Sequence, residues 1–149
     1  MSKTHGLTLE ELQELSKRAT AAKDVSYCPY SNFRVGCALL CDDGSWVIGA
    51  NVENASYPVT ICAERTALVK AITEGKKKFR AIGVSTDISP PASPCGMCRQ
   101  FIREFSDNSV PIFMYGKEEG ECVVRTLGEL LPMSFGPEDL LPPGRGARK

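Results

Sequence analysis

The sequence has no excess of charge of either sign. Lysine and arginine together number 18, and so do aspartate and glutamate. A chain without surplus positive charge has no bulk attraction for the phosphates of a polynucleotide or for an anionic membrane surface. We therefore expect neither nucleic acid nor membrane as a partner.

Long hydrophobic runs are also absent. No apolar stretch approaches the roughly 20 residues that a bilayer-spanning helix needs, and residues 1–7 lack the apolar core of a secretion signal. These absences predict a cytoplasmic protein. Seven cysteines in that compartment are typical of metal ligands, catalytic groups or small buried side chains rather than of a disulfide framework.

Histidine occurs only once, as His5 in the N-terminal segment, and we do not expect it to bind a metal. The composition is otherwise that of a globular protein, with 42% hydrophobic and 24% charged residues in 149. This length predicts one domain over residues 1–149, with a loose basic tail over about residues 142–149.

Helix and strand signals alternate along the chain. Helices are expected over residues 8–23, 60–75, 93–105 and 126–131, and strands over residues 33–41, 46–53, 81–86, 111–115 and 122–126. Thr8 and Thr126 begin capping boxes, while Thr60 and Ser93 are the expected caps of the middle helices. The order predicts a three-layer α/β/α fold, in which a mixed sheet of about five strands has helices on both faces.

Three cysteines have the spacing of metal ligands. Cys95 and Cys98 are three residues apart, so they share one helix face, and Cys62 lies at the start of another helix. The positive end of a helix favours thiolate over thiol, and hence metal capture. Because structural zinc sites usually have four protein ligands, three ligands predict a catalytic Zn²⁺ with one position open to water. Cys37 and Cys41 lie in an apolar strand and are interpreted as buried side chains.

Glu64 follows Cys62 by two residues. Taken alone, a glutamate in a helix is usually a solvated surface residue. At the first turn, however, both side chains lean toward the helix N-terminus, so the carboxylate can reach the open position of the metal without binding the ion. Its predicted role is general acid/base catalysis beside a Lewis acid.

The run from Cys62 to Glu64, followed by Pro94-Cys95-Gly96-Met97-Cys98, is the three-cysteine signature of zinc nucleoside and nucleobase deaminases. Three further stretches extend the match: residues 51–57 (NVENASY), residues 62–67 (CAERTA) and residues 134–140 (SFGPEDL). Over roughly residues 27–140 the chain resembles the small, homotetrameric cytidine deaminases of pyrimidine salvage.

The resemblance implies hydrolytic attack on C4 of cytidine or deoxycytidine, with release of ammonia and formation of uridine or deoxyuridine. It implies one Zn²⁺ per chain on Cys62, Cys95 and Cys98, with Glu64 moving the protons. Phe33 would then lie against the base, and Asn51 and Glu53 would bind the ribose hydroxyls. Without the resemblance, the last two are the polar end of a strand.

The resemblance also implies a homotetramer in which Ala55, Tyr57 and Phe135 reach active sites across subunit boundaries. By composition alone, Phe135 is an ordinary core residue. Three thiolates leave a zinc centre with a net charge of −1, so we expect Arg65 to donate to a ligand sulfur. The alternative for Arg65 is a surface position.

Other functions fit parts of this pattern. A polynucleotide-editing deaminase would share the fold, but such enzymes typically have histidine where Cys62 stands and need a basic or aromatic track for the strand. A structural zinc module would complete its site with a fourth cysteine. A deaminase for another small aminopyrimidine or for a nucleoside antibiotic is a third alternative.

Overall fold

The computed structural model describes residues 3–141, so the expected tail over residues 142–149 lies outside the described residues. Five strands alternate with four α-helices and three short 3-10 helices in this part of the chain. In chain order these are α1 (Leu9–Ala22), η1 (Lys23–Val25), β1 (Val35–Cys41), β2 (Trp46–Ala50), η2 (Tyr57–Val59), α2 (Ala63–Thr73), β3 (Phe79–Thr86), α3 (Gly96–Phe105), β4 (Pro111–Tyr115), β5 (Cys122–Thr126), α4 (Leu127–Leu130) and η3 (Pro137–Asp139).

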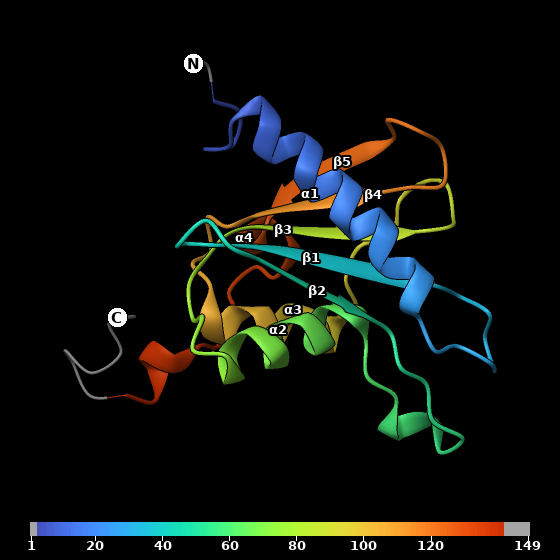
Figure 1. Ribbon diagram of the computed structural model, residues 1–149. Helices are drawn as coiled ribbons and strands as arrows, with labels where there is room; N and C mark the ends of the chain where they lie inside the picture. The colour runs from blue at the N-terminus through green and yellow to red at the C-terminus, as the bar shows by residue number, and fades with distance from the viewer. Residues whose placement is uncertain (1–2, 142–149) are drawn as a thin grey trace.

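The five strands form one mixed sheet in the order β2-β1-β3-β4-β5. Only the β3–β4 pair is parallel, and its connection contains α3. Helix α1 covers one face of the sheet, and α2 and α3 cover the other (Figure 1). The predicted α/β fold with helices on both faces is thus confirmed. Among residues 3–141, none of the helices combines the length and the apolar character needed to cross a bilayer.

Two cores fill the spaces between these layers, because successive side chains of a strand point to opposite faces. In β1, Cys37, Leu39 and Cys41 pack on the α2–α3 side, while Ala38 and Leu40 pack toward α1. Cys37 and Cys41 are buried, as the apolar strand predicts. The larger core lies under α2 and α3, so it fixes the sheet against the two helices that carry the metal-binding motifs.

The predicted starts of the outer helices are confirmed, and those of the middle helices are wrong. Thr8 and Thr126 each form a complete capping box. Helix α2, however, begins at Ala63 with Cys62 at the N-cap, and α3 begins at Gly96 with Cys95 at the N-cap. The hydroxyl of Thr60 accepts a hydrogen bond from the N–H of Asn54 instead, which holds the loop before α2.

Gly49 sets how closely α2 approaches the sheet. A Cβ at this position of β2 would lie 2.5 Å from the backbone nitrogen of Ala67 and 2.8 Å from the carbonyl oxygen of Ala63. Real Cβ atoms essentially never come this close to backbone, so only glycine allows the contact. The first turn of α2, which follows Cys62, is therefore seated directly on β2.

Candidate metal centre and active site

The starts of α2 and α3 bring three sulfur atoms together. The Sγ atoms of Cys62, Cys95 and Cys98 all lie within 4.8 Å of one another, and those of Cys62 and Cys95 are 3.9 Å apart. Tetrahedral zinc with Zn–S bonds of about 2.3 Å separates its sulfur ligands by about 3.8 Å. The donor set therefore fits a zinc ion in both atom type and spacing.

Cys62 and Cys95 occupy N-cap positions, and neither helix has a side-chain cap at that residue. The first backbone N–H groups of both helices are consequently left to favour negative charge on sulfur. Hydrogen bonding by Cys98 and Arg65 lowers the pKa of Cys62. The interaction with Cys62, together with burial, raises the pKa of Cys98. Ionisation of one thiol thus opposes ionisation of its neighbour, and a bound divalent cation would stabilise both as thiolates.

Glu64 lies beside the sulfur cluster in the first turn of α2. It is only 4% exposed, and its Oε2 atom is 3.7 Å from Cys98 Sγ. Burial raises the pKa of this carboxyl group above its ordinary value. A buried carboxyl group beside the sulfur cluster is placed to exchange protons with a molecule bound there, which is what a general acid/base needs.

Arg65 contacts the same cluster from the other side of the turn. Its Nη2 atom donates to Cys62 Sγ at 3.5 Å and lies 3.4 Å from the carbonyl oxygen of Thr60. The expected contact of a guanidinium with a ligand sulfur is present in the structure. Its positive charge would offset part of the negative charge that three thiolates concentrate at one ion.

A cavity of about 340 Å³ opens onto the metal-binding residues. Six of the residues predicted for the site line it, namely Phe33, Asn51, Glu53, Cys62, Glu64 and Cys95. The other lining residues were not predicted from the sequence as part of the site: Ser31, Val35, Thr60, Val84, Thr86, Ala92 and Ser93. Alternation along β3 accounts for two of them, since Val84 and Thr86 point to the same face of the sheet.

Asn51 and Glu53 are both held by the loop that carries Phe33. The Asn51 amide donates to the carbonyl oxygen of Phe33 at 2.7 Å and accepts from the N–H of Val35 at 3.0 Å. Glu53 Oε1 accepts from the N–H groups of Tyr30 and Ser31 at 3.0 and 3.1 Å. Hydrogen bonding from Ser31 lowers the pKa of Glu53, so the group is an ionised acceptor at neutral pH.

Three of the six residues predicted to bind the substrate do not line this cavity. Ala55 and Tyr57 belong to an exposed segment over residues 54–59 that projects from the body of the molecule (Figure 1), and the Tyr57 ring lies 5.8 Å from that of Tyr30. Phe135 is 57% exposed and therefore does not belong to the core. Its segment lies at the other end of the α2–α3 layer in Figure 1, where Gln100 donates to the Phe135 carbonyl oxygen.

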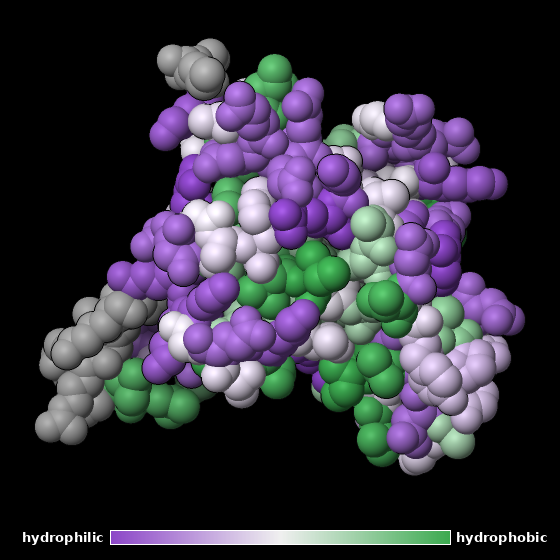
Figure 2. All heavy atoms as spheres, in the orientation of Figure 1, coloured by the Kyte–Doolittle hydropathy of each residue, from purple (hydrophilic) through white to green (hydrophobic). Residues whose placement is uncertain are grey.

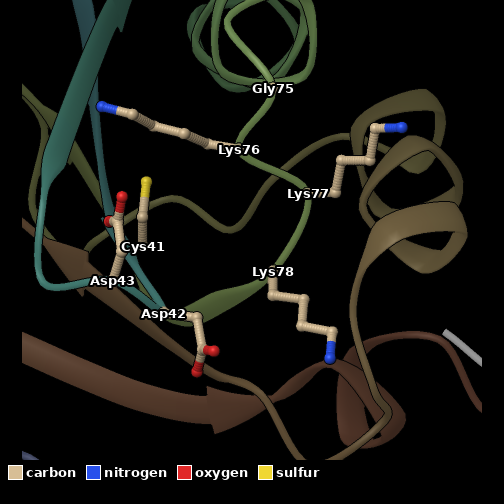
Figure 3. Close-up of a pocket in the computed structure, with 7 residues that line it drawn as sticks. All are labelled: Cys41, Asp42, Asp43, Gly75, Lys76, Lys77 and Lys78. Carbon is tan, nitrogen blue, oxygen red and sulfur yellow. The ribbon is translucent and has the colours of Figure 1, made fainter. Parts of the chain in front are cut away.

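A second cavity, of about 290 Å³, lies between the turn after β1 and the connection from α2 to β3. Its lining includes Lys76, Lys77 and Lys78 together with Asp42 and Asp43. The three lysine side chains point in different directions (Figure 3), so their charges do not converge on one ligand. The two carboxylates further oppose an anion.

The fold and the first cavity together define a zinc-dependent deaminase, in which two helix starts present three thiols beside a buried carboxyl group. Residues 9–114 match the family described as the cytidine and deoxycytidylate deaminase zinc-binding region. The chain belongs to this family, among its cytidine deaminases.

Relatives agree over most of the chain. A cytidine deaminase of Halalkalibacterium halodurans is 47% identical over 128 residues, which cover 86% of this chain and 96% of that protein. One from Sporosarcina psychrophila is 42% identical, covering 87% and 95%. The crystal structure of a cytidine deaminase from Burkholderia pseudomallei aligns with a TM-score of 0.79 at 42% identity, covering 83% of this chain and 98% of that one.

Proposed function

We propose that the protein hydrolyses the exocyclic amino group of cytidine and deoxycytidine, forming uridine or deoxyuridine and ammonia in pyrimidine nucleoside salvage. The observation that carries the proposal is the placement of buried Glu64 beside the three-cysteine cluster, in a cavity that also contains Asn51 and Glu53. Proton transfer and sugar recognition are thus available at one site.

The chemistry divides between the metal and the chain. A zinc ion held by Cys62, Cys95 and Cys98 would act as a Lewis acid that makes water nucleophilic enough to attack C4. Glu64 Oε2 accepts the two protons of the attacking water in turn, and delivers one to N3 of the base and one to the amino group, which must gain a proton to leave as ammonia. One water is consumed for each ammonia released.

The walls of the cavity position the nucleoside. Phe33, Val35 and Val84 provide apolar surface against which a flat base can pack. Asn51 and Glu53 offer polar groups to the ribose, and Glu53 is an ionised acceptor for a free 3′-OH. A 3′-phosphodiester removes that donor and places a second negative charge near the carboxylate, so polynucleotides are excluded.

The functional unit that we propose is a homotetramer with one Zn²⁺ per chain, in which residues 1–149 act as a single deaminase domain. Large exposed apolar side chains support the assembly, in particular Tyr57 at 69%, Val59 at 57% and Phe135 at 57%. Figure 2 shows hydrophobic side chains gathered beside the projecting segment. Burial against further copies of the chain would remove this surface from water.

We place this tetramer in the cytoplasm. All seven cysteines are free thiols in the structure, including the buried pair Cys37 and Cys41. Thiols that must bind metal persist in a reducing compartment, where disulfides are rare.

A substrate panel tests the function. Ammonia release and the change in ultraviolet absorbance are measured with cytidine, deoxycytidine, cytosine, 3′-CMP and a short cytosine-containing oligonucleotide. We expect turnover of both nucleosides, poor use of cytosine and rejection of the oligonucleotide. A structural zinc module would leave the absorbance constant, and equal rates on the oligonucleotide and on cytidine would favour a polynucleotide-editing enzyme.

Glu53→Gln, measured on the same panel, tests how the sugar is recognised. Glutamine replaces a charged acceptor with a neutral one, so the hydrogen bond to the sugar weakens and kcat/KM for cytidine should fall. Discrimination against 3′-CMP should weaken at the same time. An unchanged profile in Glu53→Gln would remove Glu53 from sugar recognition.

A further inference from the structure

An ion-pair cluster lies just outside the substrate cavity, formed by Lys23, Arg34 and Asp87 and called here the Asp87 cluster. Lys23 Nζ is 2.8 Å from Asp87 Oδ1, although the lysine side chain is only 8% exposed. Arg34 binds the same carboxylate with both prongs of its guanidinium, through Nε at 2.8 Å and Nη2 at 3.2 Å. One carboxylate therefore joins cations from two separate segments.

The cluster adjoins the cavity on two sides. Arg34 stands between Phe33 and Val35, which both line the cavity, and Asp87 directly follows Thr86, which also lines it. Val35 and Thr86 are the last residues paired between β1 and β3. The register places Arg34 opposite Asp87, so the ion pair continues the strand pairing by one residue beyond Val35 and Thr86.

Asp87 also begins the loop over residues 87–92, which leads to Ala92 and Ser93 in the cavity wall. The middle of this loop is attached to the β4–β5 hairpin. Ser89 Oγ donates to Glu121 Oε2 at 2.6 Å, and the N–H of Lys117 donates to the Ile88 carbonyl oxygen at 2.9 Å. Asp87 thus holds the first residue of this loop next to the cavity, while the β4–β5 hairpin holds the middle of the loop.

The charges balance within this group of residues. Arg34 Nη1 also lies 3.3 Å from Asp24 Oδ1, so two cations face two carboxylates. Hydrogen bonding from Arg34 lowers the pKa of Asp87 to about 2, so the carboxylate is ionised throughout the neutral range. Lys23 is positioned by the fold as well, because a Cβ at Gly36 would lie 2.8 Å from the Lys23 backbone nitrogen.

We propose that Asp87 is a positioning residue for nucleoside binding, which fixes the separation of the Phe33 segment from Thr86 and the loop over residues 87–92. The inference rests on the proposed function and deepens it, because it assigns a role to a loop that has no metal ligand. Glu64 and the three cysteines sit on α2 and α3, outside this cluster. Loss of Asp87 should therefore affect substrate binding and leave the chemical step intact.

The test compares Asp87→Asn with Arg80→Gln in the zinc-loaded enzyme. Arg80 is a matched control, because it forms a two-pronged ion pair with Glu11 at 2.7 and 3.0 Å at the opposite end of β3. Misplacing a binding group by about 1 Å costs up to roughly 100-fold, so we expect KM for cytidine to rise roughly 10- to 100-fold in Asp87→Asn, with kcat within about twofold of the parent. Arg80→Gln should leave both constants unchanged.

Two further variants make the outcome decisive. Asp87→Glu keeps the charge, so its KM should return most of the way to the parent value. Arg34→Gln breaks the same ion pair from the other side and should raise KM in the same way, so it replaces Asp87→Asn if Asp87→Asn does not fold. A fall in kcat with unchanged KM, or equal effects in Asp87→Asn and Arg80→Gln, would overturn the proposal.

Hydrogen exchange separates failure of this inference from failure of the proposed function. Amides of residues 31–35 and 86–92 should exchange faster in Asp87→Asn than in the parent, and at the parent rate in Arg80→Gln. This result would stand even if cytidine were not the substrate. Unchanged exchange in Asp87→Asn would contradict the positioning role whatever the activity.

Discussion

Cys62 and Cys95 occupy N-cap positions where helices usually have serine, threonine, aspartate or asparagine. A conventional cap would consume the first backbone N–H groups and stabilise its helix by roughly 1 kcal/mol. Cysteine gives up that contribution and leaves the positive helix end to act on sulfur. The packing of Ala63, Ala67 and Leu68, which are fully buried, stabilises α2 instead.

The three metal ligands can be tested one residue at a time. Removing one thiol by Cys62→Ala, Cys95→Ala or Cys98→Ala leaves two ligands, so zinc content should fall from about one per chain to near zero after dialysis. Cys122→Ala is the matched control, because Cys122 is an exposed free thiol on β5 and should leave zinc content unchanged. Metal analysis provides the measurement, and full zinc in all three ligand variants would show a wrong ligand set.

The metal-binding residues could be predicted because each lies in a short motif, with Cys62 two residues before Glu64 and Cys95 three residues before Cys98. A spacing of three residues places Cys95 and Cys98 on one helix face whatever the rest of the chain does. The Asp87 cluster could not be predicted in this way. Lys23 and Asp87 are 64 residues apart, and only the folded β1–β3 pairing brings Arg34 opposite the carboxylate.

At the scale of elements, the two wrong helix starts have a common cause. Thr60 and Ser93 are good caps by residue type, and both precede a cysteine by two residues. In the structure the chain stays extended through Cys62 and Cys95, whose ψ angles are 157° and 168°. Local propensity predicted each helix to within a few residues, but it placed the cysteines within the first turn rather than at the N-cap.

The ion pair at the end of β1 and β3 predicts how stability depends on pH. Arg34 lowers the pKa of Asp87 from its ordinary value of 3.8 to about 2 in the folded protein. The ionised carboxylate therefore stabilises the folded state at pH values above the pKa that Asp87 has in the unfolded chain. This contribution is fully present above about pH 5 and is lost as the pH falls through 3.8 toward 2.

The measurement is denaturant unfolding of the parent and of Asp87→Asn between pH 7 and pH 3. The difference in the free energy of unfolding between the two proteins should be constant near neutrality and should shrink as the pH falls. Comparing the two proteins at each pH cancels the acid-induced loss of zinc, which affects both. A difference that stays constant down to pH 3 would mean that Asp87 contributes no charge-dependent stability.

At the scale of the whole molecule, the apolar side chains that are left exposed lie outside both cores. Half of them come from the segments around Tyr57 and Phe135, and these segments lie at opposite ends of the α2–α3 layer (Figure 1). Gln100 and Arg103 of α3 hold the second segment, with Arg103 bonded to Ser134 and Glu138. A fixed segment with an outward-facing aromatic ring is suited to contact another copy of the chain.

The assembly prediction follows from that surface. Phe135→Ala should weaken the proposed homotetramer and raise KM for cytidine, because truncating an aromatic anchor at the centre of an interface costs about 2 kcal/mol or more. Light scattering gives the mass in solution. Arg125→Ala is the control, since this exposed side chain on β5 should affect neither property. A parent protein that is fully active as a monomer would contradict the proposed assembly.

The most direct test of the account is the turnover of cytidine by the parent and by Glu64→Gln, with zinc quantified in both. Glutamine keeps the size of the side chain but cannot exchange the proton, so kcat should fall by at least 10² to 10⁴. Zinc content and nucleoside binding should be retained, because Glu64 is not a ligand. Ammonia release at a near-parent rate by zinc-loaded Glu64→Gln would show that this buried carboxyl group does not carry the protons of the reaction.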